Sequence, residues 1–290
     1  MTPHIKHALL PGGPRLPYVE QGDPAGVPLV LLHGYSDSWR SWEPVLAHIP
    51  QAVHAYAVSQ RGHGDADRPT DGYRPQDLAG DAAAFMDIVG LEAAVIVGHS
   101  AGTVTAQDLA VDRPERTLGL VLVGAAPTFR GNPGVMELWD AVSGLTDPVD
   151  PGFVRAFQES TVSRPLPAAF LDAIIAESLK LPARVWKAAL HELLEAGAPT
   201  ASGPIAAPTL ILWGDHDELA RRSDQQALAA AIPHARAVTY PGCGHAPHWE
   251  QPMQVAADLA AFAASLANPP RPAPRASRQR PADPAVPVPR

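Results

Sequence analysis

Six short runs of aliphatic residues, separated by segments of helical periodicity, constrain the fold of this chain more than any other feature of its sequence. The first is VPLVLL at residues 27–32, and the others lie at residues 53–58, 94–97, 118–123, 208–213 and 235–240. Runs of Val, Ile and Leu without polar alternation are typical of strands buried on both faces. Strands that alternate with helices favour a mostly parallel central sheet with helices on both faces. The sequence therefore predicts an α/β fold.

Helical patterns fill most of the segments between these runs. We expect helices at residues 76–89, 101–111, 222–231 and 253–266. Two further candidate strands precede the first aliphatic run, at residues 6–10 and 16–21. They would add an antiparallel start to the sheet.

The alternation stops between residues 129 and 200. This segment holds no convincing strand, and its prolines divide it into short helical stretches such as residues 135–143, 152–158, 167–179 and 183–195. An all-helical insertion in an α/β chain is most simply a cap over the carboxyl ends of the strands, where open α/β sheets bind their ligands. A helical layer with only a packing role is the alternative. We expect a core of residues 1–128 and 201–268, with residues 129–200 inserted as the cap.

The end of the chain has a different composition. Residues 269–290 contain eight prolines and five arginines, and no aromatic residue. Such a segment cannot bury enough apolar surface to offset the entropy lost on ordering. We expect it to form a disordered Pro/Arg-rich tail.

Composition also limits the class of function. The formal net charge of −8 disfavours a general nucleic-acid binder, because phosphate binding needs clusters of Lys and Arg. No apolar run reaches the ~18 residues of a membrane span, and the N-terminus lacks the pattern of a secretory signal. The single cysteine, Cys243, excludes an intrachain disulfide. We expect a cytoplasmic protein that binds a small molecule and neither nucleic acid nor membrane. The sequence does not predict its oligomeric state.

The strand candidate at residues 94–97 runs directly into the sequence GHSAG at residues 98–102, and a helical pattern follows. A G-x-S-x-G sequence at a strand-to-helix turn presents its serine on a sharp, strained bend above the sheet. The bend brings backbone segments so close together that only small residues fit, which explains the two glycines. Ser100 is therefore a candidate nucleophile.

A serine hydroxyl needs a base to become nucleophilic, and the base needs an orienting acid. In chains with this type of turn, the acid and then the histidine follow the serine, each after a strand. The segment WGDHDEL ends one predicted strand and offers Asp215 and Asp217, while GCGHAPH follows the next strand and offers His245. The oxyanion formed in acyl transfer needs two N–H donors, and Tyr35 and Ala101 hold the expected positions.

Five motifs occur in one order along the chain: HGYSDSW, SQRGHGDADRP, VGHSAG, WGDHDEL and GCGHAPHWEQP. With these motifs the chain, from about residue 4 to residue 267, resembles the α/β-hydrolase fold superfamily, in its capped serine esterase-like branch. The resemblance implies Ser100 as nucleophile, His245 as general base and acid, and Asp217 as the orienting carboxylate. It also implies that the backbone N–H groups of Tyr35 and Ala101 form the oxyanion hole. Asp215 is the alternative acid.

The resemblance implies a serine hydrolase that cleaves carboxylic esters or lactones through an acyl-serine intermediate. We expect no cofactor, because no G-x-G-x-x-G loop follows a strand and no histidine-rich segment has the spacing of a metal site. The aromatic residues of the insertion suggest an apolar pocket for small to medium substrates. Trp139 and Trp186 are candidate pocket residues.

Three alternatives stay open. A hydrolase of carbon–carbon bonds in vinylogous diketones shares the fold and the triad. Such enzymes tend to have a tryptophan directly after the catalytic histidine, where this chain has Ala246, and a cap arginine, for which Arg184 is a candidate. The second alternative is a perhydrolase or haloperoxidase-like activity, and the third is a ligand sensor that keeps the triad but turns over little. The sequence does not name the substrate, because specificity depends on side chains whose orientation it does not fix.

Overall fold

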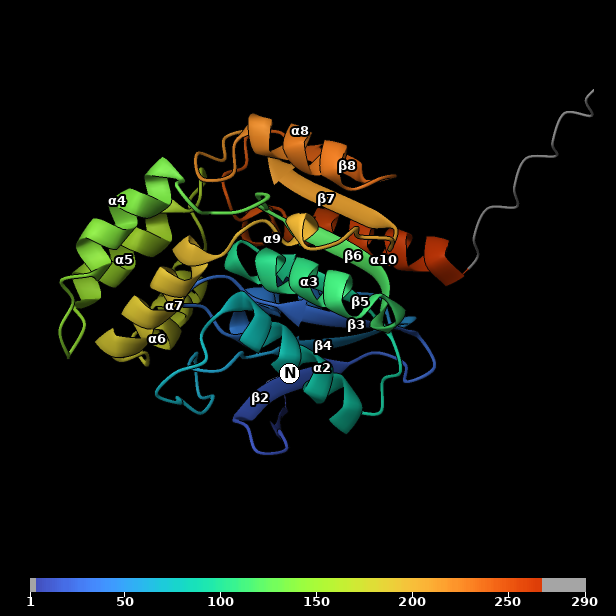
Figure 1. The fold of residues 1–290 in the computed structure, drawn as a ribbon, viewed down its shortest axis with the longest axis horizontal. Helices are drawn as coiled ribbons and strands as arrows, with labels where there is room; N and C mark the ends of the chain where they lie inside the picture. Colours follow the sequence, from blue (N-terminus) through green and yellow to red (C-terminus); the bar gives the residue numbers. More distant parts are fainter. Residues whose placement is uncertain (1–3, 268–290) are drawn as a thin grey trace, which may run out of the picture.

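An eight-stranded sheet forms the centre of the protein (Figure 1), and the computed structural model describes residues 4–267. In the order of the sheet, the strands are β1 (Ile5–Leu9), β2 (Arg15–Gln21), β4 (Val53–Val58), β3 (Val27–Leu32), β5 (Ala94–His99), β6 (Thr117–Val123), β7 (Thr209–Gly214) and β8 (Arg236–Tyr240). β2 pairs antiparallel with β1 and β4, and every other neighbouring pair is parallel. The predicted α/β fold class is confirmed.

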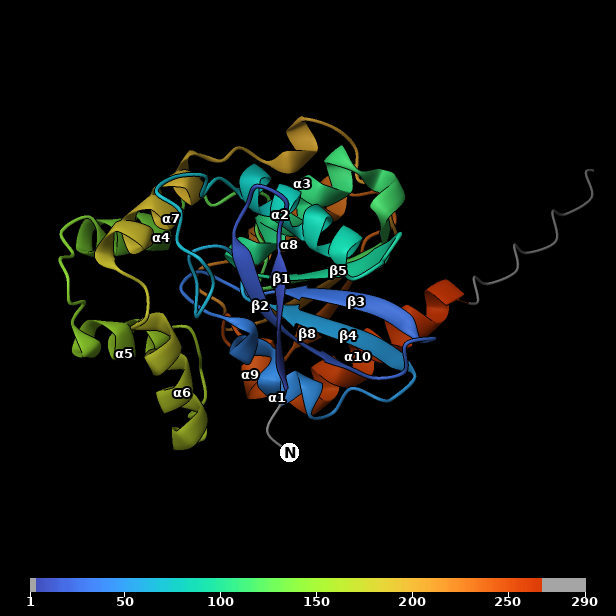
Figure 2. The same ribbon diagram turned by 90° about the horizontal axis from the view of Figure 1, so that it is seen from below.

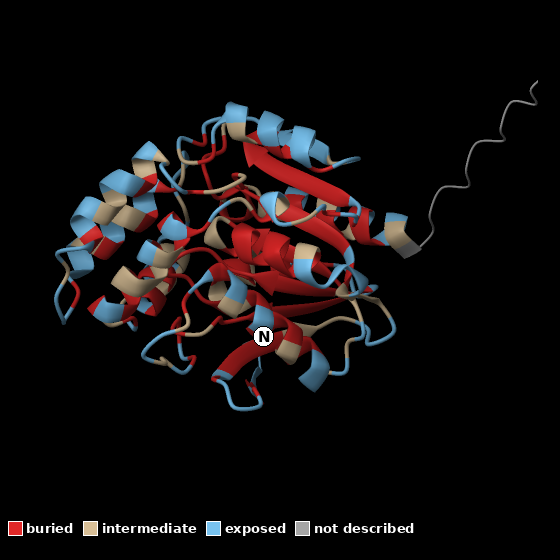
Figure 3. Cartoon of the chain, in the orientation of Figure 1, coloured by how far each residue is buried: buried red, intermediate tan, exposed pale blue. Residues whose placement is uncertain are grey.

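Helices cover both faces of the sheet (Figure 2). One face carries α2 (Pro75–Ile88), α3 (Ala101–Asp112) and α8 (Arg222–Ala231), and the other carries α1 (Glu43–Leu46) and α10 (Pro252–Ala267). Within β3, Val30 and Leu32 belong to the first hydrophobic core, whereas Leu29 and Leu31 belong to the second. Because both faces of the strand are buried, it has no polar alternation. Figure 3 shows the central strands of the sheet buried and the exposed residues on the outer sides of the helices, whereas the edge strands β1 and β8 are largely exposed.

Four helices lie between β6 and β7, and we call them the inserted helices. They are α4 (Pro133–Val142), α5 (Pro151–Ser160), α6 (Ala168–Ser178) and α7 (Ala183–Glu195), and their bounds differ from the expected ones by at most two residues. They lie at the end of the sheet toward which the parallel strands point (Figure 1). They share a hydrophobic core in which Val142, Val154 and Trp186 are fully buried.

Short elements complete the described chain: η1 (Trp39–Trp42), η2 (Pro114–Arg116), η3 (Pro199–Ala201) and α9 (Pro247–Glu250). Elements of one turn carry no periodicity that would predict them from the sequence. The tail expected at residues 269–290 lies outside the described residues. Within residues 4–267, no helix is both long enough and apolar enough to cross a bilayer.

Candidate active site

Ser100 lies on the sharp turn between β5 and α3, with a positive φ of 50° that non-glycine residues rarely adopt. The glycines on either side are required by their surroundings. A Cβ on Gly98 would lie 2.3 Å from the carbonyl oxygen of Gly102, and a Cβ on Gly102 would lie 2.5 Å from that of His33. The backbone crossing at this turn therefore excludes any larger residue, and it holds the serine in its strained conformation.

His245 joins Ser100 to Asp217. Its Nε2 lies 2.8 Å from Oγ of Ser100, and its Nδ1 lies 2.9 Å from Oδ2 of Asp217. Because an ionised carboxylate only accepts hydrogen bonds, Nδ1 carries the proton and Nε2 is free to accept one from the serine. The backbone N–H of His245 also donates to the carbonyl oxygen of Thr161, which follows α5. The three predicted residues thus come together in the order that proton transfer needs.

The two aspartates after β7 have different surroundings. The carboxylate of Asp217 is buried, and its Oδ1 accepts the backbone N–H groups of Leu219 and Ala220 at 2.9 and 2.8 Å. Asp215 is exposed and accepts the N–H of Gly242 at 2.6 Å, a contact within the surface turn. Only Asp217 of the pair contacts His245.

Tyr35 and Ala101 are the residues expected to form the oxyanion hole, and Tyr35 lines the same cavity as Ser100. Tyr35 follows β3 in a loop braced by His33, whose Nδ1 lies 2.8 Å from the carbonyl oxygen of Gly34 and whose Nε2 accepts the N–H of Gln60 at 3.0 Å. Burial lowers the pKa of His33 well below its usual range, so the imidazole is neutral. Ala101 is the first residue of α3, where backbone N–H groups have no partner within the helix. Within residues 4–267 neither the Tyr35 N–H nor the Ala101 N–H donates a backbone hydrogen bond outside the helices and strands, as the role predicted for them requires.

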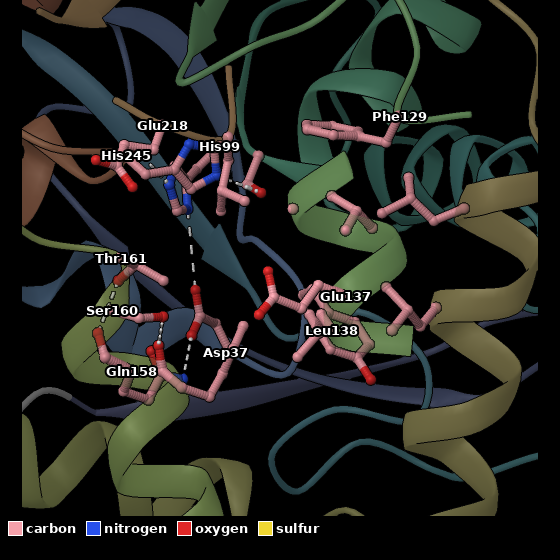
Figure 4. A pocket seen from close by; sticks show the side chains of 18 of the residues that line it. Asp37, His99, Phe129, Glu137, Leu138, Gln158, Ser160, Thr161, Glu218 and His245 are labelled. Atoms are coloured by element: carbon pink, nitrogen blue, oxygen red, sulfur yellow. Dashed lines mark hydrogen bonds and ion pairs between the residues drawn. The ribbon is translucent and has the colours of Figure 1, made fainter. Parts of the chain in front are cut away.

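Ser100 and His245 open into a cavity of about 510 Å³, bounded largely by the inserted helices. Its wall is mainly apolar, and the apolar side chains are Phe129, Pro133, Val135, Leu138, Phe153, Ala156, Phe157, Leu190, Leu193, Leu219 and Trp249. The ionisable side chains on the wall, apart from the histidines, are Asp37, Glu137, Glu218 and Arg221. Figure 4 shows how Asp37 and Glu137 approach this space from opposite sides.

Neither Trp139 nor Trp186, the predicted pocket residues, lines this cavity. Trp186 is fully buried, and its ring packs edge-on against Tyr35 and Phe157 behind the cavity wall. Trp139 is half-buried and packs against His191. The composition of the insertion indicated an aromatic-rich segment, but the side to which each ring points depends on how the helices pack.

Sequence reasoning missed the polar residues that line the cavity beside the catalytic residues, among them Asp37, Gln158 and Glu137. Asp37 follows Tyr35 by two positions in the same loop, and this proximity was the available signal. Gln158 and Glu137 come from the inserted helices α5 and α4, whose inward faces the sequence did not reveal. Among residues 4–267, no group of three His, Cys, Asp or Glu side chains is arranged to hold a metal ion.

A model of the Alpha/beta hydrolase family matches residues 29–259 of this sequence, which include Ser100, Asp217 and His245. The match covers most of the chain and both parts of the sheet. The chain belongs to the alpha/beta hydrolase family. Ser100 of this hydrolase occupies the turn that the fold uses for a nucleophile.

Relatives of this hydrolase act on different bonds. A solved esterase from Rhodococcus sp. ECU1013 is 30% identical, with a TM-score of 0.80 over 90% of this chain and 99% of that one. The 2-hydroxymuconate semialdehyde hydrolase of Pseudomonas sp. (strain CF600) is 27% identical over 263 residues, 86% of this chain and 89% of its own. Epoxide hydrolase B of Mycobacterium tuberculosis is 37% identical over 133 residues, 44% of this chain and 36% of its own. These relatives share the family of this protein but are named for the cleavage of different bonds, so the family alone does not determine which bond this protein cleaves.

Proposed function

We propose that this protein cleaves small to medium carboxylic esters or lactones through an acyl-serine intermediate. The observation that carries the proposal is the hydrogen-bonded series Ser100, His245 and Asp217 at the wall of a largely apolar cavity. A carboxylate nucleophile would be needed for the alkyl-ester route of epoxide hydrolases and dehalogenases. The residue on the turn here is a serine, which suits acyl transfer.

The proposed reaction begins with attack of Ser100 Oγ on the substrate carbonyl carbon, while the serine proton passes to Nε2 of His245. Asp217 stabilises the imidazolium, and the N–H groups of Tyr35 and Ala101 stabilise the oxyanion. Collapse of the tetrahedral intermediate breaks the bond to the leaving oxygen, which takes the proton from His245. A water molecule then gives a proton to Nε2 of His245 and attacks the acyl carbon. The second tetrahedral intermediate collapses, the bond to Ser100 Oγ breaks, and Oγ takes the proton back from His245 as the acid leaves.

Cleavage of a carbon–carbon bond is the second candidate, because the hydrolase from Pseudomonas matches 86% of this chain. The contacts of Arg184 do not favour it. This arginine, the candidate for binding an anionic diketone, donates to the carbonyl oxygens of Pro69 and Arg68 at 2.8 and 2.7 Å and does not line the cavity. Glu137, Glu218 and Arg221 give the cavity wall an excess of negative charge even with Asp37 uncharged, and this excess disfavours an anionic substrate.

A panel of neutral 4-nitrophenyl esters and lactones, assayed with the wild type and Ser100→Ala, tests the proposal. We expect hydrolysis that falls by about 10⁴-fold or more in Ser100→Ala. Ser202→Ala is the matched control, because Ser202 is exposed and does not line the cavity, and it should keep the wild-type rate. Equal rates in the wild type and Ser100→Ala would reject the proposal.

Three other results would each select another function. Cleavage of a vinylogous diketone with no ester hydrolysis would favour the carbon–carbon hydrolase. Tight binding of an ester without turnover would favour the ligand sensor. The perhydrolase-like alternative predicts peracid formation when hydrogen peroxide replaces water in deacylation. A cytoplasmic location stays a prediction of the sequence.

A further inference from the structure

The loop between β3 and η1, residues 33–38, carries Tyr35, and we call it the oxyanion loop. It also contains a buried carboxyl group, that of Asp37. Asp37 follows Tyr35 by two residues, and its side chain is only 3% exposed although it borders the same cavity as Ser100. A Cβ on Gly34 would lie 3.2 Å from Oδ2 of Asp37 and 2.8 Å from Nδ1 of His99. Both groups thus pack against the backbone that leads to the Tyr35 N–H.

The carboxyl group of Asp37 connects three parts of the molecule. Its Oδ1 accepts a hydrogen bond of 3.2 Å from Nε2 of Gln158, on the inserted helix α5, and its Oδ2 accepts one of 3.3 Å from Oγ of Ser41. Nδ1 of His99 lies 3.9 Å from the same Oδ2. Figure 4 shows Asp37 between His99 on one side and Gln158 on the other.

The hydrogen bonds of His99 determine which of its ring nitrogens faces Asp37. Nε2 lies 3.2 Å from the carbonyl oxygen of His245, and since a carbonyl only accepts, Nε2 carries the proton. Burial lowers the pKa of His99 well below its usual range, so the ring is neutral and Nδ1 is a bare acceptor. This Nδ1 is buried and has no hydrogen-bond partner within the described residues. If Asp37 were ionised, two unprotonated acceptors would face each other in a buried site.

We propose that Asp37 is a positioning residue for the oxyanion loop, and that it works as a neutral carboxylic acid whose O–H faces Nδ1 of His99. In this form it holds Gly34 and the Tyr35 N–H in place through Gln158 and Ser41. Ionised, it would place a negative charge next to the site where the tetrahedral intermediate develops its own negative charge. The proposal rests on the acyl transfer proposed for Ser100, whose oxyanion the loop would bind.

The charge states of the groups around Asp37 are consistent with a neutral carboxylic acid at this position. Burial raises the pKa of Asp37 to about 7, against the hydrogen bonds from Gln158 and Ser41 and the charge of His245, which lower it. His99 and, through Ser41, His248 are uncharged because burial lowers their pKa values well below the usual range. On α6, Glu177 is paired with Arg40 and Lys180. No lysine or arginine pairs with the Asp37 carboxylate within residues 4–267.

The rate at which a fluorophosphonate labels Ser100, measured from about pH 5 to about pH 9, tests this role. In the wild type the rate should fall above about pH 7, by on the order of tenfold or more, as Asp37 ionises. Asp37→Asn should be active and lack the fall, because an amide cannot ionise and can donate N–H to Nδ1. Gln158→Leu should move the fall to higher pH, since it removes a donor that stabilises the ionised form.

Asp108→Asn is the matched control. Burial raises the pKa of Asp108 to about 6, yet its side chain lies on α3 away from the cavity. This variant should keep the wild-type profile. A fall that persists unchanged in Asp37→Asn, or that does not move in Gln158→Leu, would overturn the proposal. The Gln158 variant decides the question if Asp37→Asn does not fold.

The outcomes separate this proposal from the proposed function. Labelling with the expected profile but without hydrolysis of any ester would reject the function and support the role of Asp37. Ester hydrolysis by the wild type, together with a pH profile of labelling that Asp37→Asn leaves unchanged, would support the function and reject the role of Asp37. If Ser100 is not labelled at all, infrared spectroscopy decides: the C=O band of a protonated carboxyl, lost in Asp37→Asn, supports the proposal, and its absence at about pH 6 rejects it.

Discussion

At the scale of single residues, the orientation of His245 depends on a carboxylate on one side and a serine on the other. Replacing Asp217 by Asn would let the amide donate to Nδ1 and would favour the tautomer in which Nε2 carries the proton. Asp217→Asn should therefore lower kcat by about 10⁴-fold with little change in KM. Asp215→Asn, which alters a surface turn, should change kcat by less than about threefold. Steady-state kinetics of both variants check this, and a severe effect confined to Asp215→Asn would contradict the assignment.

Asp37 also links stability to pH. In the folded protein its pKa is about 7, above the ordinary value of 3.8, so between these values the folded state holds a proton that the unfolded chain has released. Stability from this group is present at low pH and is lost as pH rises toward 7. The free energy of unfolding of the wild type, minus that of Asp37→Asn, should fall by up to about 4 kcal/mol from about pH 4 to about pH 8, because only the wild type loses stability as Asp37 ionises. Urea unfolding at both pH values measures it, and a difference that is independent of pH would contradict the raised pKa.

At the scale of elements, the turn between β5 and α3 depends on its glycines. Gly98→Ala would place a methyl group 2.3 Å from a backbone oxygen, and we expect a loss of at least about 3 kcal/mol in unfolding free energy. Gly80→Ala is the control, because its Cβ would meet nothing within 4 Å on the exposed side of α2. That change should stabilise by about 0.5–1 kcal/mol. Similar unfolding midpoints for the two variants would show that the close approach at Gly98 is not required.

Elements were the level at which the sequence was most informative. Strands such as β3 and β5 were predictable because burial on both faces demands long aliphatic runs, and Ser100 was predictable because its turn requires glycines at fixed positions. The place of His245 after a strand made it predictable, whereas the same argument left Asp215 and Asp217 open, and the family resemblance selected Asp217. Gln158 and the orientation of Trp186 were not predictable, because both depend on how the inserted helices rotate against the core. Asp37 was visible in the sequence, but its burial was not.

At the scale of the whole molecule, the inserted helices contact the oxyanion loop through Trp186, and the residue that follows α5, Thr161, accepts the backbone N–H of His245. Trp186 on α7 lies against Tyr35 of the oxyanion loop, with ring centroids 5.3 Å apart, and against Phe157 of α5. Trp186→Ala should lower the unfolding free energy by about 3–5 kcal/mol and reduce kcat through the loosened loop. Trp139→Ala, a half-buried ring on the same helical layer, should cost less than about 2 kcal/mol. Thermal or urea unfolding compares them, and equal losses would mean that Trp186 does not hold this layer to the core.

The central claim is that Ser100 becomes acylated during turnover. The protein would be mixed with an excess of 4-nitrophenyl butyrate, quenched with acid within the first turnovers, digested and examined by mass spectrometry. We predict a butyryl group on the peptide that contains Ser100, formed at the rate of nitrophenol release and absent in Ser100→Ala. A butyryl group on another residue, or nitrophenol release that continues in Ser100→Ala without an adduct, would contradict the claim.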